Sequence, residues 1–179
     1  MTQCNDNFLS PTGFILDIPG FSSIGFHCVS ANIPGISMGG PQQATPFNDF
    51  QLSADKLSYD NLTVRFLVDE YCANYALIHN WMVGITYPQY LEQWKEFKQE
   101  MQDKDFKTDD PDTIDLTLRI LTSNYNTAFK CKFLDAAPIS LSTLEFSTEQ
   151  SDVQYLTAEV TFRYVYFKLT DTTDKNLTL

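Results

Sequence analysis

Alternation of apolar and polar residues with a period of two recurs along this chain, and it constrains the fold more than any other feature. The clearest run is 62–68, where Leu, Val, Phe and Val occupy every second position with Thr and Arg between them. The stretches 113–121 and 153–169 alternate in the same way. Because successive side chains of a strand point to opposite faces, this period predicts strands with one buried face. Sheets buried on one face are typically antiparallel.

Shorter segments add further strands to this set. Residues 13–18 and 23–32 are rich in β-forming residues, and the Pro19-Gly20 pair between them is typical of a type II turn. We predict that these two segments pair as a hairpin. Two more strands are predicted at 127–136 and 140–147. The sum is a mainly β fold, an antiparallel β-sandwich or barrel of roughly six to eight strands with one or two inserted α-helices.

The period changes from two to that of a helix shortly after the strand at 62–68. An apolar stripe then predicts an amphipathic helix that ends at Gly84. The carboxylates of Asp69 and Glu70, just before the stripe, are predicted to cap the first turn. A second helix is predicted at 87–102, followed by an acidic loop. Residues 86–112 therefore combine a helix and an acidic loop within a single domain spanning 1–179. The stripe comprises Tyr71, Tyr75, Ile78 and Met82.

Residues 33–50 predict a long loop, because they contain three Pro and three Gly and fit no helix or strand. A loop of this length within a compact domain is typically functional or bound to a partner. Several of its side chains are apolar and would be poorly accommodated on an isolated monomer. We therefore predict a subunit interface formed by Ile36, Met38, Phe47 and Phe50.

Asp69, Glu70, Cys72 and His79 lie close together in the sequence, which raises the question of a nucleophile–base pair or a metal site. On a helix, Cys72 and His79 would share a face but lie two turns apart, about 10 Å along the axis. A nucleophile cannot contact its base at that separation, and zinc pairs on one helix favour i, i+4 spacing. We interpret Cys72 as a small buried residue and His79 as a half-buried histidine. A thiol or metal enzyme is the least favoured hypothesis.

Other signatures of chemistry are weak. His27 and Cys28 are neighbours on a predicted strand, so their side chains point to opposite faces. The carboxylates of 108–112 lack the glycine and terminal glutamate of an EF-hand loop. Neither a GxSxG motif nor a phosphate-binding loop is present. We therefore expect no catalytic residue, no metal site, no cofactor and no enzymatic activity.

The chain is strongly acidic, with 12 Lys and Arg against 23 Asp and Glu and a net charge of −11. This charge argues against DNA binding driven by phosphate neutralisation and against contact with anionic membranes. The four cysteines are scattered without a CxxC pair, which favours reduced thiols. No signal peptide and no run of ~18 apolar residues is visible, so no membrane contact is expected.

Three segments, taken in their order, resemble the tail-tube protein family of contractile-tail bacteriophages. "FHCVSANIPG" resembles the family's early strand and its Pro-containing turn. "LSADKLSYDNLTVRFLVDEYCANYALIHNWMVGI" resembles its succession of long loop, turn, alternating strand and helix. "FLDAAPISLSTLEFSTEQSDVQYLTAEVTFRYVYF" resembles its closing strands. The resemblance covers 13–169, and the order of the pieces is more specific than any one of them.

The resemblance implies a β-sandwich that assembles as a hexameric ring, with rings stacking into a tube through which DNA passes without specific binding. It implies a structural virion protein whose partners are other copies of itself, the tail sheath, and baseplate or neck proteins. The protein would lie in the virion tail, and in the host cytoplasm during assembly. The long loop and the termini would contact neighbouring subunits or rings. The best candidates for a face lining the lumen are Thr157, Glu159, Thr161 and Arg163.

Relative to the plainest tube subunits of that family, residues 86–112 resemble a helical and acidic insertion. This difference keeps other members of the same fold open: a tube-initiating baseplate protein, a tail-completion protein or a terminator. A further alternative is a monomeric β-sandwich that binds a carbohydrate or a protein. The acidic charge fits a conduit, because like charge keeps phosphates from adhering to its wall.

Overall fold

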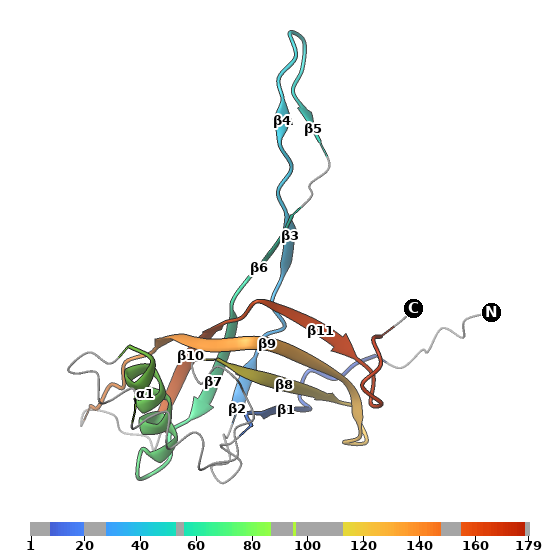
Figure 1. The fold of residues 1–179 in the computed structure, drawn as a ribbon. Coiled ribbons are helices and arrows are strands. Elements are labelled where there is room, and N and C mark those ends of the chain that lie inside the picture. Colours follow the sequence, from blue (N-terminus) through green and yellow to red (C-terminus); the bar gives the residue numbers. More distant parts are fainter. Residues whose placement is uncertain are drawn as a thin grey trace.

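The computed structural model describes residues 8–19, 28–52, 56–86, 95, 113–147 and 155–177. Its strands and its long helix follow one another along the chain as shown in Figure 1. They are β1 Phe14–Asp17, β2 Cys28–Ala31, β3 Ile36–Met38, β4 Gln42–Gln43, β5 Phe50–Gln51, β6 Leu57–Tyr59, β7 Leu62–Leu67, α1 Ala73–Thr86, β8 Ile114–Leu121, β9 Thr127–Leu141, β10 Thr157–Arg163 and β11 Tyr166–Thr170.

The body is a sandwich of two antiparallel layers that share the long strand β9. The first layer runs β1-β8-β9-β11, and the second runs β9-β10-β7-β2. The N-terminal part of β9 pairs with β8 and β11, whereas residues 137–141 pair with β10. The predicted class, a mainly β antiparallel sandwich with an inserted helix, is confirmed.

The core lies between the layers and consists of the alternating positions of each strand. In β7, Leu62, Val64 and Phe66 are each at most 1% exposed. The indole of Trp81 on α1 packs against Phe162 of β10, with ring centroids 6.0 Å apart, and so covers one end of the sandwich. Burying a side chain of this kind stabilises the fold by about 1.5–3 kcal/mol. Other buried members are Ile78, Ile114, Leu116, Leu118, Cys131, Phe133 and Val160.

The bend that lets β9 serve both layers is centred on Asp135, whose φ is 53°. The Asp135 N–H donates to the carboxylate of Asp115, at 3.1 Å, and the β8–β9 register shifts beside it. The alternation of side chains between the two faces of β9 shifts by one residue there: Phe133 and Ala136 are both buried although they are three residues apart. We call this shift a change of side-chain phase. Beyond Ala136, β9 pairs only with β10, so Pro138 is tolerated without a backbone N–H.

Two strand predictions were wrong. Segments 13–18 and 23–32 do not form a hairpin: β1 pairs with β8 and β2 pairs with β7, at opposite ends of the sheet order. The apolar positions of β1 match those of β8, with Phe14 opposite Ile120, and this distant partner outweighs the local turn. A separate strand at 140–147 is also absent, because β9 continues to Leu141 and 142–147 is irregular.

The predicted strand 153–169 is divided into β10 and β11 by Tyr164 and Val165, and 153–154 lie outside the described residues. A constant period along 153–169 places Tyr166 in the core together with Phe162 and Tyr164, but Tyr166 is 37% exposed and Phe167 packs against the core instead. The division lies opposite the bend of β9, since Arg163 pairs with Ala137 and Tyr166 with Leu134. Both strands therefore change side-chain phase at the same point.

Helix α1 confirms the predicted helix but differs at both ends. It passes through the buried Gly84 to Thr86, so the predicted stop at Gly84 was wrong. Asp69 and Glu70 precede the helix, and the first turn of α1 contains no acidic residue. The buried Asn74 forms the cap instead: its amide oxygen accepts from the N–H groups of Asp69 (3.2 Å) and Tyr75 (2.9 Å). Its amide nitrogen donates to Leu67 O at 2.8 Å, tying the helix to β7.

The apolar stripe of α1 is also rotated from the prediction, since Tyr71 is 86% exposed while Trp81 is 1% exposed. The predicted second helix at 87–102 lies outside the described residues apart from Lys95, which is helical. The acidic loop lies outside them entirely. Within the described part of the chain, no helix is long and apolar enough to traverse a bilayer.

Candidate assembly surfaces

Residues 33–52 and 56–60 belong to a long β-hairpin that projects from the body, and we call this hairpin the arm (Figure 1). Two short ladders hold it together, β3 with β6 and β4 with β5. Further backbone bonds join Leu52 N to Pro41 O (3.0 Å) and Asp60 N to Gly35 O (3.1 Å). The sequence-based expectation that 33–50 contains no regular element was therefore wrong. The Pro and Gly residues all lie outside the ladder strands, so they remove none of the ladder pairs.

The four predicted interface residues all lie on the arm, and all are exposed. The exposed fractions are 53% for Ile36, 69% for Met38, 99% for Phe47 and 59% for Phe50. Leu52 and Leu57, at 49% and 53%, add to this apolar surface. The structure thus brings the four residues together on one projection, and their role as an interface remains a prediction.

The base of the arm is anchored to the body by an aromatic cluster. The Tyr164 hydroxyl donates to the carbonyl oxygen of Asp60, at 2.7 Å, where the arm returns to β7. The Tyr59 ring at the end of β6 lies 6.2 Å from the Tyr164 ring and 5.7 Å from the Phe167 ring. Phe133 packs edge-on against Tyr164 at 5.0 Å. Burial, with smaller contributions from Asp60 and Tyr59, raises the pKa of Tyr164 from 10.0 to about 12.

Asn32 and Gly35 close the other side of the base. The Asn32 amide oxygen accepts from Thr63 N at 2.6 Å, and its nitrogen donates to Asn61 O at 3.4 Å. A Cβ at position 35 would lie 2.7 Å from the Asp60 carboxylate, so the two strands approach closely where glycine stands. The arm therefore leaves the body along a defined direction.

The outward face of β10 carries the predicted lumen residues. Thr157, Glu159 and Arg163 are exposed and Thr161 is half-buried, while the residues between them are buried. Glu159 lies opposite Arg65 of β7. The predicted alternation is confirmed as burial, and the assignment to a lumen remains a prediction.

A polar hollow of about 610 Å³ lies on the outer face of the first layer. Arg119 Nη2 donates to Asp17 Oδ1 at 2.8 Å. The ammonium groups of Lys130 and Lys132 both contact the carboxylate of Asp174, at 3.2 and 3.0 Å. These lysines, Lys132 first, hold the pKa of Asp174 below its usual value. We call the surface formed by these five residues the cationic hollow.

Sequence reasoning missed the cationic hollow. Its residues come from four separate segments, and only the register of β1, β8 and β9 brings them together. Asp174 arrives because 171–177 turns back on β11, with Asp171 N bonded to Lys175 O and Leu177 N to Leu169 O. Residues 171–177 of the tail are thus held against β11. Alternation could have assigned the outward face of each strand, but not the pairing between strands.

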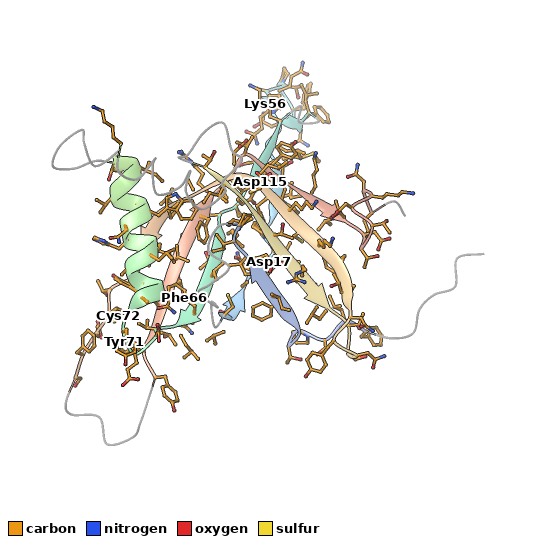
Figure 2. The ribbon with its side chains drawn as sticks, turned by 60° about the horizontal axis from the view of Figure 1, so that its bottom comes forward. Asp17, Lys56, Phe66, Tyr71, Cys72 and Asp115 are labelled. Atoms are coloured by element: carbon orange, nitrogen blue, oxygen red, sulfur yellow. The ribbon has the colours of Figure 1, made fainter. Side chains whose placement is uncertain are left out.

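Cys72 and His79 do not form a catalytic pair. Cys72 is half-buried with a φ of 52° and precedes α1, where its carbonyl accepts the first helical bond from Ala76 N. His79 is exposed, so its predicted half-burial was wrong, and its Nδ1 contacts Asn80 Oδ1 at 3.3 Å. Figure 2 shows Tyr71 and Cys72 at the entrance to α1. Among the described residues, no three His, Cys, Asp or Glu side chains converge to hold a metal ion.

The thiols of Cys28 and Cys131 are poor nucleophiles, because burial raises the pKa of each to about 11. At neutral pH both are therefore protonated. Cys131 is fully buried in the core beside Phe133. Both thus behave as small apolar residues, while His27 lies outside the described part of the chain.

The fold is similar to that of several contractile injection system proteins. A chain of the anti-feeding prophage baseplate superposes with a TM-score of 0.58 at 9% identity, covering 92% of this chain and 97% of that one. The sheath/tube terminator of an extracellular contractile injection system, PVC, gives 0.58 at 14% identity, with 93% and 99% covered. The sheath–tube complex of that system gives 0.55 at 13% identity, with 94% and 95% covered.

At these identities the likeness concerns the fold. No curated protein matches this chain in sequence. The family of phage tail tube proteins, in contrast, matches residues 6–170, which include the arm, α1 and both layers of the sandwich. This chain therefore belongs to the phage tail tube protein family.

Proposed function

We propose that this chain is a subunit of a hexameric ring, and that its rings stack into a tail tube through which DNA passes. The family supports a structural role in a tail. The arm supports assembly, because it presents apolar side chains that the described part of the chain leaves uncovered. A monomer keeps such a projection in water at a cost, whereas a ring or a stack of rings buries it.

The exposed residues of the arm are the observation that carries this proposal. Phe47 and Met38, at 99% and 69% exposed, are among its most exposed apolar side chains. Burying an apolar side chain of this size contributes about 1.5–3 kcal/mol, so a few of them supply much of the energy of a subunit contact. Ile36 extends the apolar surface of the arm towards the body, and Phe50 lies on the arm between Met38 and Phe47. The arm is accordingly the contact that one subunit offers to its neighbours.

The lumen is assigned to the outward face of β10, formed by Thr157, Glu159, Thr161 and Arg163. Two hydroxyl groups, one carboxylate and one guanidinium give a polar wall with little net charge. A chain of net charge −11 repels phosphate as a whole, so DNA would move along this wall without binding to it. A density map of the assembled particle, with these side chains located relative to the central channel, tests the assignment.

The proposed partners are further copies of the chain, the tail sheath, and baseplate or neck proteins. The proposed location is the virion tail, and the host cytoplasm during assembly. The chain acts as one domain with an insertion at 86–112, and it has no enzymatic role. An adaptor that starts or ends the tube has the same fold requirements, so a position at either end of the tail is the alternative within this proposal.

Purified protein tests the proposal through its oligomeric state. Light scattering after gel filtration should show hexamers or larger species, and electron microscopy should show rings or tubes. The double variant Met38→Ser/Phe47→Ser should remain folded but lose assembly, because it removes apolar area from the arm and leaves the ladders intact. Gln43→Ser is the matched control, since Gln43 lies on the same arm and contributes no apolar surface.

Two results would contradict the proposal. One is a monomeric wild-type species near 20.5 kDa at high concentration, with or without a tail template. The other is undiminished assembly of the double variant, which would show that the arm does not make the contact.

A further inference from the structure

The body has one end rich in cations, although the chain as a whole is acidic. In the cationic hollow, Arg119, Lys130 and Lys132 contact two carboxylates of the described residues, those of Asp17 and Asp174. Lys130 also reaches the backbone oxygen of Thr172 at 3.4 Å. Asp174 is shared between two ammonium groups, each of which has three donors, so donors remain for a further acceptor. The hollow is thus suited to receive carboxylates from another molecule.

The opposite end of the body is acidic and aromatic. Asp69 and Glu70 are exposed just before α1, and Glu145 is exposed in the segment that follows β9. Exposed aromatic rings accompany them, with Tyr71 at 86% and Phe146 at 76%. The Tyr75 hydroxyl donates to Ser142 O at 3.1 Å and fixes this segment beside α1. Asp69, Glu70 and Tyr71 come just before α1, and Glu145 and Phe146 follow Ser142, so these residues belong to the two segments that the Tyr75–Ser142 bond joins. We call them together the acidic entrance.

These two surfaces of one chain cannot contact each other. Lys130 lies near the start of β9, whereas Ser142 follows its last residue, Leu141. Twelve residues of strand span roughly 40 Å, and the bend at Asp135 shortens this only in part. Both views agree, since α1 lies at one end of the body and β1 with the start of β9 at the other (Figures 1 and 2).

We propose that the cationic hollow of one subunit receives the acidic entrance of the next copy in the ring. This inference rests on the proposed ring. A contact between two different surfaces of identical chains is head-to-tail, and repetition of such a contact closes a ring when the rotation fits. The arm projects from the body in a different direction from the line that joins the two surfaces (Figure 1). The arm is therefore free to reach an adjacent ring while the two ends join subunits within one ring.

Opening the hollow to a neighbour costs little, because its ion pairs are partly exposed and such pairs contribute about 0–1 kcal/mol. Side chains of Lys132 and Asp174 are 37% and 53% accessible, so a new carboxylate can bind without removing either. Charge complementarity of this kind mainly fixes the register of a contact and raises its association rate. The exposed rings of Tyr71 and Phe146 add apolar area beside the charges.

Charge reversal tests the contact. Lys132→Glu and Glu70→Lys should each reduce the fraction of protein in rings by at least about tenfold at low salt, because each places like charges face to face. The chain that carries both changes should regain rings, since the pair is restored across the interface with its sign inverted. Restoration cannot come from repair of the fold, because the two positions lie at opposite ends of the body. Lys95→Glu is the control: it changes the net charge as Lys132→Glu does, but Lys95 is exposed and belongs to neither surface.

The outcomes separate the two proposals. If the wild-type chain forms no rings, the proposed function fails. If it forms rings and Lys132→Glu forms them equally well, or if both single variants fail and the double variant does not recover, the head-to-tail contact is wrong while the ring stands. Should Lys132→Glu lose its fold, Glu70→Lys decides the matter alone, since Glu70 is exposed and lies outside every strand and helix.

Discussion

Removal of a single oxygen atom at the base of the arm should loosen the link between the arm and the body. Tyr164→Phe deletes the hydroxyl that donates to Asp60 O at 2.7 Å and leaves the ring between Tyr59, Phe133 and Phe167. An intramolecular hydrogen bond contributes about 0.5–1.5 kcal/mol, and a carbonyl left without a donor raises the cost. We therefore expect a loss of about 1–2 kcal/mol near pH 7, or roughly 2–8 °C in the melting temperature for a chain of this size.

The pH dependence of this difference provides a sharper test. In the folded protein the pKa of Tyr164 is raised from 10.0 to about 12, so the folded state favours the protonated phenol. The protonated hydroxyl of Tyr164 therefore contributes fully to the free energy of unfolding below pH 10. This contribution declines as the pH rises and is lost above pH 12. This rise in the pKa corresponds to a total of about 2.7 kcal/mol in the free energy of unfolding, of which about 1.4 kcal/mol is lost by pH 11. Phenylalanine does not titrate, so Tyr164→Phe lacks this decline.

Urea unfolding followed by tryptophan fluorescence at pH 8, 10 and 11 measures the effect. The stability advantage of the wild type over Tyr164→Phe should shrink by about 1.4 kcal/mol between pH 8 and pH 11. Other tyrosines titrate in both proteins, so their effects cancel in the difference. Tyr125→Phe is the matched control, because Tyr125 is 80% exposed and loses the same oxygen atom. An advantage that is absent at pH 8, or that does not change with pH, would refute the anchoring role of Tyr164.

Three further predictions concern local structure and reactivity. Asn74→Ala removes one donated and two accepted hydrogen bonds and should lower the free energy of unfolding by about 1–3 kcal/mol, whereas the exposed His79→Ala should stay within about 0.5 kcal/mol by the same urea titration. Asp135→Val should cost about 1–3 kcal/mol because a β-branched residue opposes a φ of 53°, while Asp135→Gly should unfold at a higher urea concentration than Asp135→Val. A thiol reagent at pH 8 should modify Cys131 in the folded protein many times more slowly than in urea, and equal rates would contradict its burial.

Periodicity was sufficient to locate the strands whose two faces differ in environment. In β7, β8 and β10 every second residue is buried, so the sequence itself carries the signal. The same reasoning predicted the outward positions of Glu159 and Arg163. These are properties of single strands and need no knowledge of the neighbours. The helix after β7 was predictable for the same reason, although its buried stripe is rotated towards Asn74 and Trp81.

Pairing between strands was not predictable, because it depends on residues far apart in the chain. The turn signal at Pro19-Gly20 favoured a local hairpin, whereas β1 finds a better apolar match in β8 about a hundred residues later. The prediction of which residue caps α1 was wrong for a similar reason. Carboxylates before a helix predict a charged cap, but the buried amide of Asn74 reaches the backbone of β7 as well as that of the helix. Only the packed structure shows that advantage.

The bend in β9 explains the errors in the C-terminal strands together. A positive φ at Asp135 changes the side-chain phase of β9, and its neighbour changes phase at Tyr164 and Val165. The predicted strand at 127–136 therefore extends past Pro138, and Tyr166 turns from the core to the surface. Asparagine and aspartate adopt this conformation more readily than most residues, but an aspartate within a strand pattern is not a signal on its own. A one-residue change of phase is invisible to a rule that assumes a constant period.

The surfaces proposed for assembly lie at the points where the regular pattern ends. The arm begins where Tyr164 closes the aromatic cluster, beside the bend of β9, and the acidic entrance begins where β7 ends and α1 starts. Solved proteins with 9–14% identity share the sandwich over more than 90% of this chain, so the alternating pattern needs little identity to specify the layers. Charges such as those of Lys132 and Glu70 are not required by the layers. In the proposed ring, charges of this kind decide which partner surface a subunit accepts, because a like charge on the wrong partner opposes the contact.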